Sequence, residues 1–394
     1  MNADNDNADA TLLPTGMSDT LPPDAAFEAH VVERLMQMFA AQGYDRVKPP
    51  LLEFEDTLFR GPGAATANDA FRLMDPESQR MMALRADMTP QIARIAMSRL
   101  ANAPRPLRLS YAGQILRIRG SQLRGARQFG QVGAEIIGTD SRAADAEVVV
   151  MASDTLMALG IQGLSVDLCI STLVPAACRD FGFGADIANR LNPALDRKDA
   201  AAIEKLRGDL GGEATDLFIA LLGATGKASV MLERLAALSL GSAATQERDD
   251  LTTVASTIME SAPALEVTID PIERRGWEYH CGVSFTFFAK GTRGELGAGG
   301  RYLTGDGAVD RHREPATGLT LFTDTLVQAV TPGEAAPRIY LPLGSDASAA
   351  ARYRDEGWVT VRGLDTNNDP AAEAARLGCS HVYAGGDAKP VSDQ

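Results

Sequence analysis

The sequence has little cysteine, few aromatic residues and no long apolar run. Its four cysteines lie far apart without a CxxC pair, which argues against a zinc site or a disulfide scaffold and favours a reducing cytoplasm. No apolar stretch approaches the roughly 20 residues that a membrane span needs, so we expect no membrane partner. The first twenty residues lack a basic start and an apolar stretch, so we expect no secretory signal there.

The composition indicates an acidic globular protein of two to three domains. Apolar residues make up 45% and charged residues 23% of the 394 residues, which is ordinary for a globular chain. Lys and Arg total 38 against 52 Asp and Glu, which gives a net charge of −14. A surface of this sign repels phosphate backbones, so we expect no nucleic-acid partner, although a local basic patch is compatible with the count.

The first part of the chain predicts a tail, a helix and an edge strand. Residues 1–20 are polar and read as a flexible tail. From Asp24 apolar residues recur at helical spacing, and Gly43 follows as a stop signal. The next segment, YDRVKPPLLE, reads as a short strand that lies at a sheet edge or an interface, because a double proline cannot donate to a ladder.

The middle of the chain alternates strand and helix signals. Thr89 and Pro90 predict a helix start, with Thr89 as the N-cap. PLRLSYAGQILRIR and ARQFGQVGAEIIG predict an antiparallel hairpin, and 142–159 predict a helix. Residues 174–262 are rich in Ala and Leu at helical spacing and predict a helical insertion, after which strand signals resume.

We therefore predict an α+β fold with an antiparallel sheet flanked by helices. The core spans residues 21–330 and contains the insertion at about 174–262. TPGEAAP at 331–337 has the composition of a linker. Beyond it, 338–394 alternate short strands with Ala-rich helical stretches and predict a small βαβαβ unit.

The second hairpin strand carries a polar face that could form the floor of a ligand site. Alternate residues of a strand share a face, so Gln131, Gly133 and Glu135 point one way and Val132 and its alternates point into a core. A carboxylate accepts from an ammonium or imidazole, an amide both donates and accepts, and the glycine leaves room. A solvated outer face, common in antiparallel sheets, is the alternative.

Two further clusters have a ligand-binding and a structural interpretation. Asp87 and Thr89 precede a helix, where a carboxylate could meet an amino acid's ammonium group; simple helix capping is the alternative. RRGWEYHCG contains Arg275, Tyr279 and His280, which could surround an imidazole and its carboxylate or form the edge of a core. GAGGRY lacks the strand and helix context of a nucleotide motif, so its glycines could serve close backbone approach.

A local reversal of charge marks the hairpin loop. Four arginines lie within eleven positions, and guanidinium groups suit phosphate or carboxylate. They indicate an anionic ligand or an acidic partner, with a solvated loop as the alternative. These residues are Arg117, Arg119, Arg124 and Arg127.

Taken in order, these segments resemble histidyl-tRNA synthetase, a class II aminoacyl-tRNA synthetase, over about residues 14–330. YDRVKPPLLE and the preceding helix resemble motif 1, which forms the family's dimer interface. The family's LRPEGT segment resembles LRADMT here, and motif 2 resembles QILRIRGSQLRGARQFGQVGAE. The histidine-specific RGLDYY segment resembles RRGWEYHCG, and GAGGRY stands as in the family. Motif 3 resembles ATGLTLFTDTLVQ.

The resemblance implies a retained histidine site and a lost nucleotide site. Arg119 replaces the motif 2 glutamate that contacts adenine, Gly120 replaces the next arginine, and in motif 3 Thr325 and Phe322 replace the ATP-stacking arginine and a glycine. Loss of such groups removes several kcal/mol of transition-state stabilisation. The implied histidine-binding residues are Asp87, Thr89, Arg117, Gln131, Glu135, Arg275, Tyr279 and His280, the last in place of a family tyrosine.

This combination resembles the regulatory subunits of ATP phosphoribosyltransferase, which are inactive paralogues of the synthetase. The resemblance implies a cytoplasmic, non-enzymatic protein that assembles with the short catalytic subunit for the first step of histidine biosynthesis, as a homodimer within a larger hetero-oligomer. It also implies histidine as a feedback effector, and we expect no metal and no tightly bound cofactor. The alternatives are an active histidyl-tRNA synthetase or related amino-acid ligase, or another synthetase-like paralogue.

Overall fold

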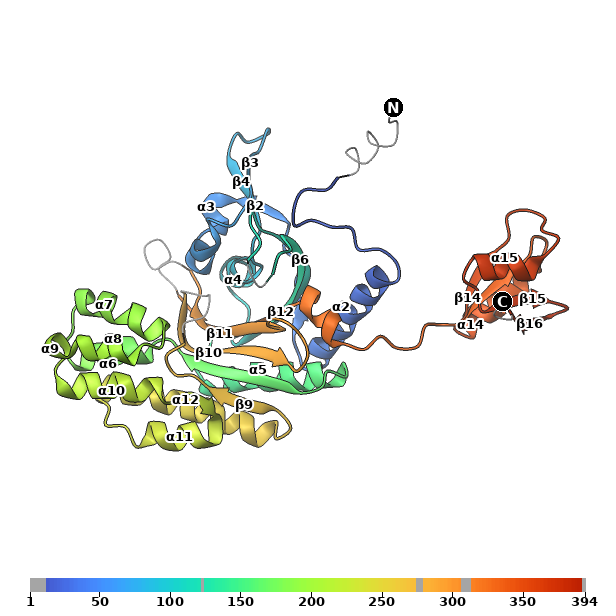
Figure 1. Ribbon diagram of the computed structural model, residues 1–394. Helices are drawn as coiled ribbons and strands as arrows, with labels where there is room; N and C mark the ends of the chain where they lie inside the picture. The colour runs from blue at the N-terminus through green and yellow to red at the C-terminus, as the bar shows by residue number, and fades with distance from the viewer. Residues whose placement is uncertain (1–11, 122–123, 274–278, 306–312, 392–394) are drawn as a thin grey trace, which may run out of the picture. The chain divides into compact units, whose positions relative to one another are not determined.

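A nine-stranded sheet forms the centre of the first of two compact units, which spans residues 1–331 (Figure 1). The computed structural model describes residues 12–121, 124–273, 279–305 and 313–391. The strand order is β1-β5-β6-β12-β11-β10-β7-β9-β8, and all pairs are antiparallel except β1 with β5 and β7 with β9. The strands are β1 (Asp45–Arg46), β5 (Leu107–Leu116), β6 (Gln128–Ile137), β7 (Leu164–Ile170), β8 (Gly226–Lys227), β9 (Glu266–Ile269), β10 (His280–Ala289), β11 (Gly297–Leu303) and β12 (Pro315–Phe322).

Two hydrophobic clusters cover the two faces of the sheet. The larger includes Val132, Ala134 and Ile136 of β6, together with side chains of α2, α5 and α12. The smaller includes Tyr111 and Phe129 with side chains of α4. These helices are α2 (Asp24–Ala41), α4 (Thr89–Ser98), α5 (Arg142–Ala158), α12 (Ser242–Ser261) and, after β12, α13 (Thr323–Ala329). The antiparallel hairpin of β5 and β6 and the inward face of Val132 are confirmed.

Helices of the region 173–261 lie together beside one part of the sheet (Figure 1). Leu191, Phe218 and Ile258 belong to the same hydrophobic cluster as the sheet, so these helices share its core. The two-residue strand β8 interrupts them and pairs with β9. The helices before α12 are α6 (Leu173–Asp180), α7 (Ala185–Asp196), α8 (Ala200–Lys205), α9 (Arg207–Leu210), α10 (Gly212–Leu222) and α11 (Ala228–Ala236).

The double proline separates two strands of different sheets. β1 precedes it at the edge of the large sheet, as predicted, whereas β2 follows it in a small sheet of order β2-β4-β3. The single strand predicted across Pro49 and Pro50 is therefore wrong, because neither proline has an N–H to continue a ladder. The remaining elements here are β2 (Leu52–Phe54), α3 (Glu55–Leu58), the 3-10 helix η1 (Gly61–Thr66), β3 (Arg72–Met74) and β4 (Met81–Leu84).

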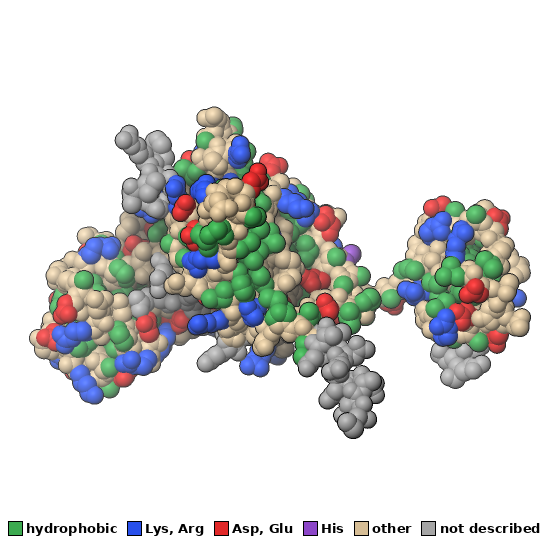
Figure 2. Space-filling model, turned by 90° about the horizontal axis from the view of Figure 1, so that it is seen from above, with side chains coloured by type: hydrophobic (Ala, Val, Ile, Leu, Met, Phe, Trp, Pro, Cys, Tyr) green, Lys and Arg blue, Asp and Glu red, His purple; other side chains and the backbone are tan. Residues whose placement is uncertain are grey.

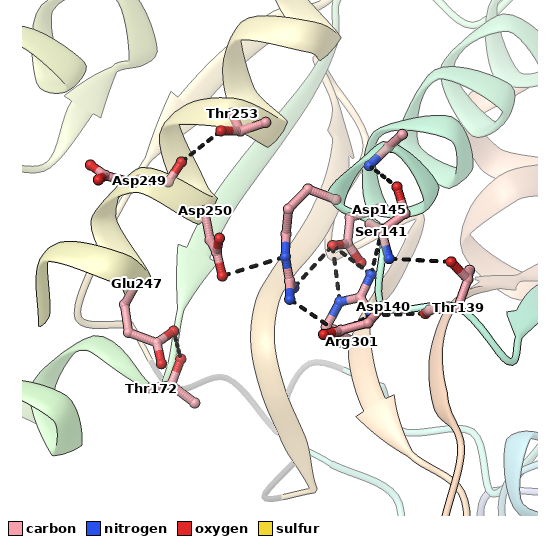
Figure 3. A network of polar contacts seen from close by, with 12 residues as sticks. Thr139, Asp140, Ser141, Asp145, Thr172, Glu247, Asp249, Asp250, Thr253 and Arg301 are labelled. Atoms are coloured by element: carbon pink, nitrogen blue, oxygen red, sulfur yellow. Dashed lines mark hydrogen bonds and ion pairs between the residues drawn. The ribbon is translucent and has the colours of Figure 1, made fainter. Parts of the chain in front are cut away.

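A buried ionic network joins β11 to α5 (Figure 3). Arg301 is 2% exposed, and its guanidinium lies 2.9 Å from Asp145 Oδ2 and donates to the Ser141 carbonyl at 2.8 Å. Arg142 lies 3.6 Å from Asp145 and 3.4 Å from Asp250 on α12. The network thereby connects the strand that carries GAGGRY to the helices that flank the sheet.

The second unit, residues 332–394, holds a four-stranded sheet of order β14-β13-β15-β16. Its first three strands are parallel and connected by helices, as the sequence pattern predicts. The sequence prediction missed the fourth strand, β16, which pairs antiparallel with β15 across Gly385 and Gly386, both at positive φ. The elements are β13 (Arg338–Leu341), α14 (Ala347–Asp355), β14 (Val359–Arg362), α15 (Pro370–Arg376), β15 (His381–Ala384) and β16 (Asp387–Pro390).

Charges of both signs are mixed on the face of the molecule seen from the side of β3 and β4 (Figure 2). A band of hydrophobic side chains runs between them. Leu73, Met74 and Met81 of the small sheet are among the exposed apolar residues of the chain. Within the described ranges, no helix has the length and apolar character needed to cross a bilayer.

Candidate functional site

A narrow cavity lies where β6, β11 and β12 meet the start of α4. It is lined by Thr89, Glu135, Tyr279, His280 and Tyr302, together with backbone and small side chains of β11 and β12. Glycines make the cavity possible, because a Cβ on Gly318 would lie 1.6 Å from Glu135 Oε2 and one on Gly299 would lie 2.0 Å from the Gly318 carbonyl. The GAGGRY glycines therefore serve close approach between strands.

Glu135 is the centre of this cavity, and its side chain is 1% exposed. The hydroxyl of Tyr302 donates to Oε2 at 3.0 Å, and the hydroxyl of Tyr111 donates to Oε1 at 3.2 Å. Burial raises the pKa of Glu135 to about 8, although these hydrogen bonds oppose the shift. The face of β6 that carries Gln131 and Glu135 is thus buried, and its interpretation as a solvated outer face is wrong.

Asp87 and Gln131 form a second polar group beside the first turn of α4. Gln131 Oε1 accepts from the Met88 amide at 2.9 Å, and Asp87 Oδ1 accepts weakly from the Thr89 amide at 3.4 Å. Among the described residues, neither Asp87 Oδ2 nor Gln131 Nε2 has a hydrogen-bond partner, although both atoms are buried. Burial raises the pKa of Asp87, and the nearby Arg117 charge and Gln131 amide oppose this.

Thr89 is the first residue of α4 and not its N-cap, so the predicted capping role is wrong. Met88 occupies the N-cap position, and its side chain makes no capping hydrogen bond. The Thr89 hydroxyl instead lies 3.3 Å from the Tyr111 hydroxyl, inside the site. Its side chain is therefore directed toward Glu135 and not toward the helix amides.

Tyr279 and His280 line the cavity from the start of β10. Their rings pack edge to face at 5.0 Å, and Tyr279 packs in the same way on Tyr302 at 5.9 Å. Burial lowers the pKa of His280 to about 4, so its imidazole is neutral at pH 7. The predicted site residue Arg275 lies outside the described residues.

A second cavity of about 250 Å³ adjoins the first, and His280 and Gly299 line both. Arg117 lines the second cavity and also interacts with the Asp87 charge. The structure therefore brings Thr89, Glu135, Tyr279 and His280 into one cavity. It places Asp87 and Gln131 beside that cavity and Arg117 in the next.

Arg124 and Phe322, which belong to the segments that resemble motifs 2 and 3, line the second cavity and contact each other. The guanidinium of Arg124 lies over the Phe322 ring at 4.0 Å and over Phe129 at 4.6 Å. Its Nε donates to Asp324 at 2.8 Å. The Thr325 hydroxyl is also occupied, since it donates to the Glu295 carbonyl at 2.8 Å.

Sequence reasoning missed three residues of the site. Tyr111, Tyr302 and Thr320 form its hydrogen-bond network with Glu135, and each is at most 5% exposed. A tyrosine or threonine in a strand is typical of an ordinary core, so neither stands out by type. The pairing register of the β5–β6 hairpin could have identified Tyr111, because Tyr111 lies opposite Gly133, a residue already assigned to the ligand floor.

Comparison with known proteins gives consistent relationships over almost the whole chain. Residues 16–326 match the family model described as histidyl-tRNA synthetase. The ATP phosphoribosyltransferase regulatory subunit of Paramagnetospirillum magneticum is 52% identical over 376 residues, which cover 95% of this chain and 97% of that protein. The regulatory subunit of Gluconobacter oxydans is 43% identical, with 97% and 98% covered.

Solved structures show the same relationship at the level of the fold. A Bacillus halodurans structure described as an ATP phosphoribosyltransferase regulatory subunit/histidyl-tRNA synthetase superimposes with a TM-score of 0.79 at 25% identity, covering 93% of this chain and 96% of that one. Histidyl-tRNA synthetase from Nostoc shares the fold, with a TM-score of 0.78 at 16% identity and coverages of 94% and 90%. The chain belongs to the family of ATP phosphoribosyltransferase regulatory subunits, which have the histidyl-tRNA synthetase fold.

Proposed function

We propose that this chain is a non-catalytic subunit that binds free histidine and regulates a catalytic ATP phosphoribosyltransferase subunit. The observation that carries the proposal is the pair of buried carboxylates, Asp87 and Glu135, beside the unpartnered Gln131 Nε2. Buried ionisable and polar groups cost free energy unless they are paired. A ligand with an ammonium group and an imidazole supplies partners for both carboxylates.

Each part of histidine has a matching group in the site. The ammonium would contact Asp87 Oδ2 and the Thr89 hydroxyl, while the ring would contact Glu135. Arg117 is available for the ligand carboxylate, since its Nε makes only a long bond of 3.3 Å to the Ala86 carbonyl. The orientation then places the ligand carboxylate toward the second cavity, which Arg117 lines.

Histidine binding requires a local rearrangement. The first cavity has a volume of about 10 Å³, which is enough for roughly one water molecule. Tyr279 and His280 therefore move when an imidazole enters. His280 also lines the larger second cavity, which offers space for this movement.

The proposal includes the loss of amino-acid activation. An activating enzyme must hold ATP with groups that stabilise charge in the transition state. Here the Phe322 ring lines the second cavity. The Arg124 guanidinium lies over this ring and forms an ion pair with Asp324. Arg124 is only 11% exposed, so its charge is already neutralised within the chain.

Regulation also requires partner chains. We propose assembly with the catalytic subunit in the cytoplasm, where the free cysteines of the chain stay reduced, and a homodimer through the motif 1 segment. Histidine would favour one arrangement of the complex by about 1–3 kcal/mol, which is typical of allosteric coupling. By linkage, a substrate of the catalytic subunit would weaken histidine binding to the same extent.

Titration calorimetry with histidine tests the binding site. The full-length chain should give a saturable isotherm that Glu135→Ala abolishes. Glu147→Ala should retain it, because Glu147 of α5 pairs with Arg108 outside the site. Absence of binding by the unaltered chain would refute the effector site.

Two further measurements test the other parts of the proposal. The catalytic subunit should co-elute with this chain in size-exclusion chromatography. Histidine-dependent exchange between ATP and pyrophosphate should be at background, and a clear exchange signal would instead support an active synthetase.

A further inference from the structure

Tyr111 lies at the centre of the hydrogen-bond network, although no family motif quoted above contains it. Its side chain is fully buried, and its ring packs in the hydrophobic cluster between β5 and α4. Its hydroxyl lies 2.8 Å from the Thr320 hydroxyl, 3.3 Å from the Thr89 hydroxyl and 3.2 Å from Glu135 Oε1. A single phenol thus connects the ammonium end of the proposed ligand site to its ring end.

Two glycines leave the space that the phenol and the carboxylate occupy. A Cβ on Gly133 would lie 2.3 Å from the Tyr111 hydroxyl, so the glycine opposite it in β6 is needed for the ring to pass under the sheet. On the neighbouring strand, Gly318 gives the Glu135 carboxylate its space. Two glycines therefore place the phenol and the carboxylate at hydrogen-bond distance.

We propose that Tyr111 is a positioning residue that orients Glu135 so that the site selects a basic ring. The inference rests on the proposed histidine site and adds the ring chemistry that it recognises. Tyr302 donates to Oε2 and Tyr111 donates to Oε1, while the Thr320 hydroxyl donates to the Tyr111 oxygen. Two donors on the same carboxyl group polarise it, which makes its own O–H a stronger hydrogen-bond donor.

The ring selected is one whose nitrogen is a strong hydrogen-bond acceptor. In the ligand-free chain burial keeps Glu135 protonated at pH 7. When a neutral imidazole enters, the Glu135 carboxyl group donates a hydrogen bond to a ring nitrogen, while both phenols continue to donate to the same carboxyl group. No covalent bond is made or broken, and the proton stays on Glu135. A triazole has nearly the same shape but is a much weaker base, so its ring nitrogen is a weaker acceptor.

The test compares histidine with 1,2,4-triazolyl-3-alanine by calorimetry at pH 7. The unaltered chain should bind histidine at least tenfold more tightly than the triazole. Tyr111→Phe keeps the ring but removes one hydrogen bond to the Glu135 carboxyl group, so histidine affinity should fall about tenfold and the preference should shrink by the same factor. Triazole affinity should stay within twofold, a pattern that general loosening of the fold does not produce.

Tyr44→Phe is the matched control. Tyr44 is 1% exposed, and its hydroxyl also lies 3.2 Å from a glutamate, Glu147, outside the site. This variant should keep both affinities. If the unaltered chain binds histidine and Tyr111→Phe keeps the full preference over triazole, the role of Tyr111 is refuted while the histidine site stands. If the unaltered chain binds neither ligand, both proposals are refuted.

Discussion

Glu135→Gln should make the ligand-free protein more stable while disrupting the proposed histidine site. Burial raises the pKa of Glu135 from 4.5 to about 8, so the folded chain keeps a proton that the unfolded chain releases. Between these two pH values stability falls as pH rises, because the unfolded state binds fewer protons. Between pH 4.5 and pH 7 the protein therefore loses about 3 kcal/mol of folding free energy, because each pH unit in this range costs about 1.36 kcal/mol. Glutamine avoids this penalty, since its amide resembles the protonated acid.

Urea unfolding at pH 5, 6 and 7, followed by circular dichroism, measures this effect. The free energy of unfolding of Glu135→Gln should exceed that of the unaltered chain by less than about 1 kcal/mol at pH 5 and by about 3 kcal/mol at pH 7. The control is Glu147→Gln. The hydrogen bond from Arg108 lowers the pKa of Glu147, so the ionised Glu147 side chain already makes its full contribution to stability above about pH 4.5. This control should be destabilised equally at all three pH values.

The pH dependence of the difference in stability shows whether burial keeps Glu135 protonated. If Glu135→Gln is no more stable than the unaltered chain, and its difference from that chain is the same at pH 5 and pH 7, then Glu135 is not held protonated by burial. The C-terminal unit provides an internal reference, because it is a separate compact unit and its unfolding should not respond to the substitution.

Three other predictions concern a buried ion pair, a glycine beside Glu135 and an exposed cysteine. Arg301→Ala leaves buried Asp145 with only the more distant Arg142 guanidinium, at 3.6 Å, and should destabilise the core by about 3–5 kcal/mol in urea unfolding. The loss of stability in the double variant Arg301→Ala with Asp145→Ala should be smaller than the sum of the two single losses. Gly318→Ala places a Cβ 1.6 Å from Glu135 Oε2 and should abolish histidine binding in calorimetry, whereas Gly184→Ala, which meets no atom within 4 Å, should retain it. Cys281 is the exposed member of the four cysteines, so a thiol reagent should modify it first in the native protein, and Cys281→Ser should remove that rapid phase in a colorimetric titration.

The order of helices and strands could be predicted from the sequence because local signals mark it. The alternation along β6 correctly placed Val132 in the core and Gln131 and Glu135 on the opposite face. It could not decide whether that face meets water, because burial depends on α4 and β10, which arrive from distant parts of the chain. The helix start at Thr89 was correctly located within one residue, yet the role of its hydroxyl depends on Tyr111 in another strand.

Long-range pairs explain most of what sequence reasoning missed. Arg301 and Asp145 are 156 positions apart and belong to segments with no common motif. The bonds from Tyr111 to Thr320 and from Tyr302 to Glu135 also join distant strands. β16 was missed for a different reason, since four residues after a Gly-Gly turn give too short a pattern to identify a strand.

Under the proposed function, the pairing of β6 with β12 accounts for a floor that keeps the histidine half of a site and loses the nucleotide half. Glu135 pairs with Gly318, so the carboxylate end has open space opposite it, whereas Gln131 pairs with Phe322, so a ring fills the floor four residues away. Four residues of strand span about 13 Å, roughly the length of an amino acid with an activated group attached. Arg124 then lies on Phe322 and is held there by Asp324. Under the proposed function, the change from Gly318 to Phe322 along β12 leaves space beside the carboxylate and fills the opposite end of the floor without altering the sheet.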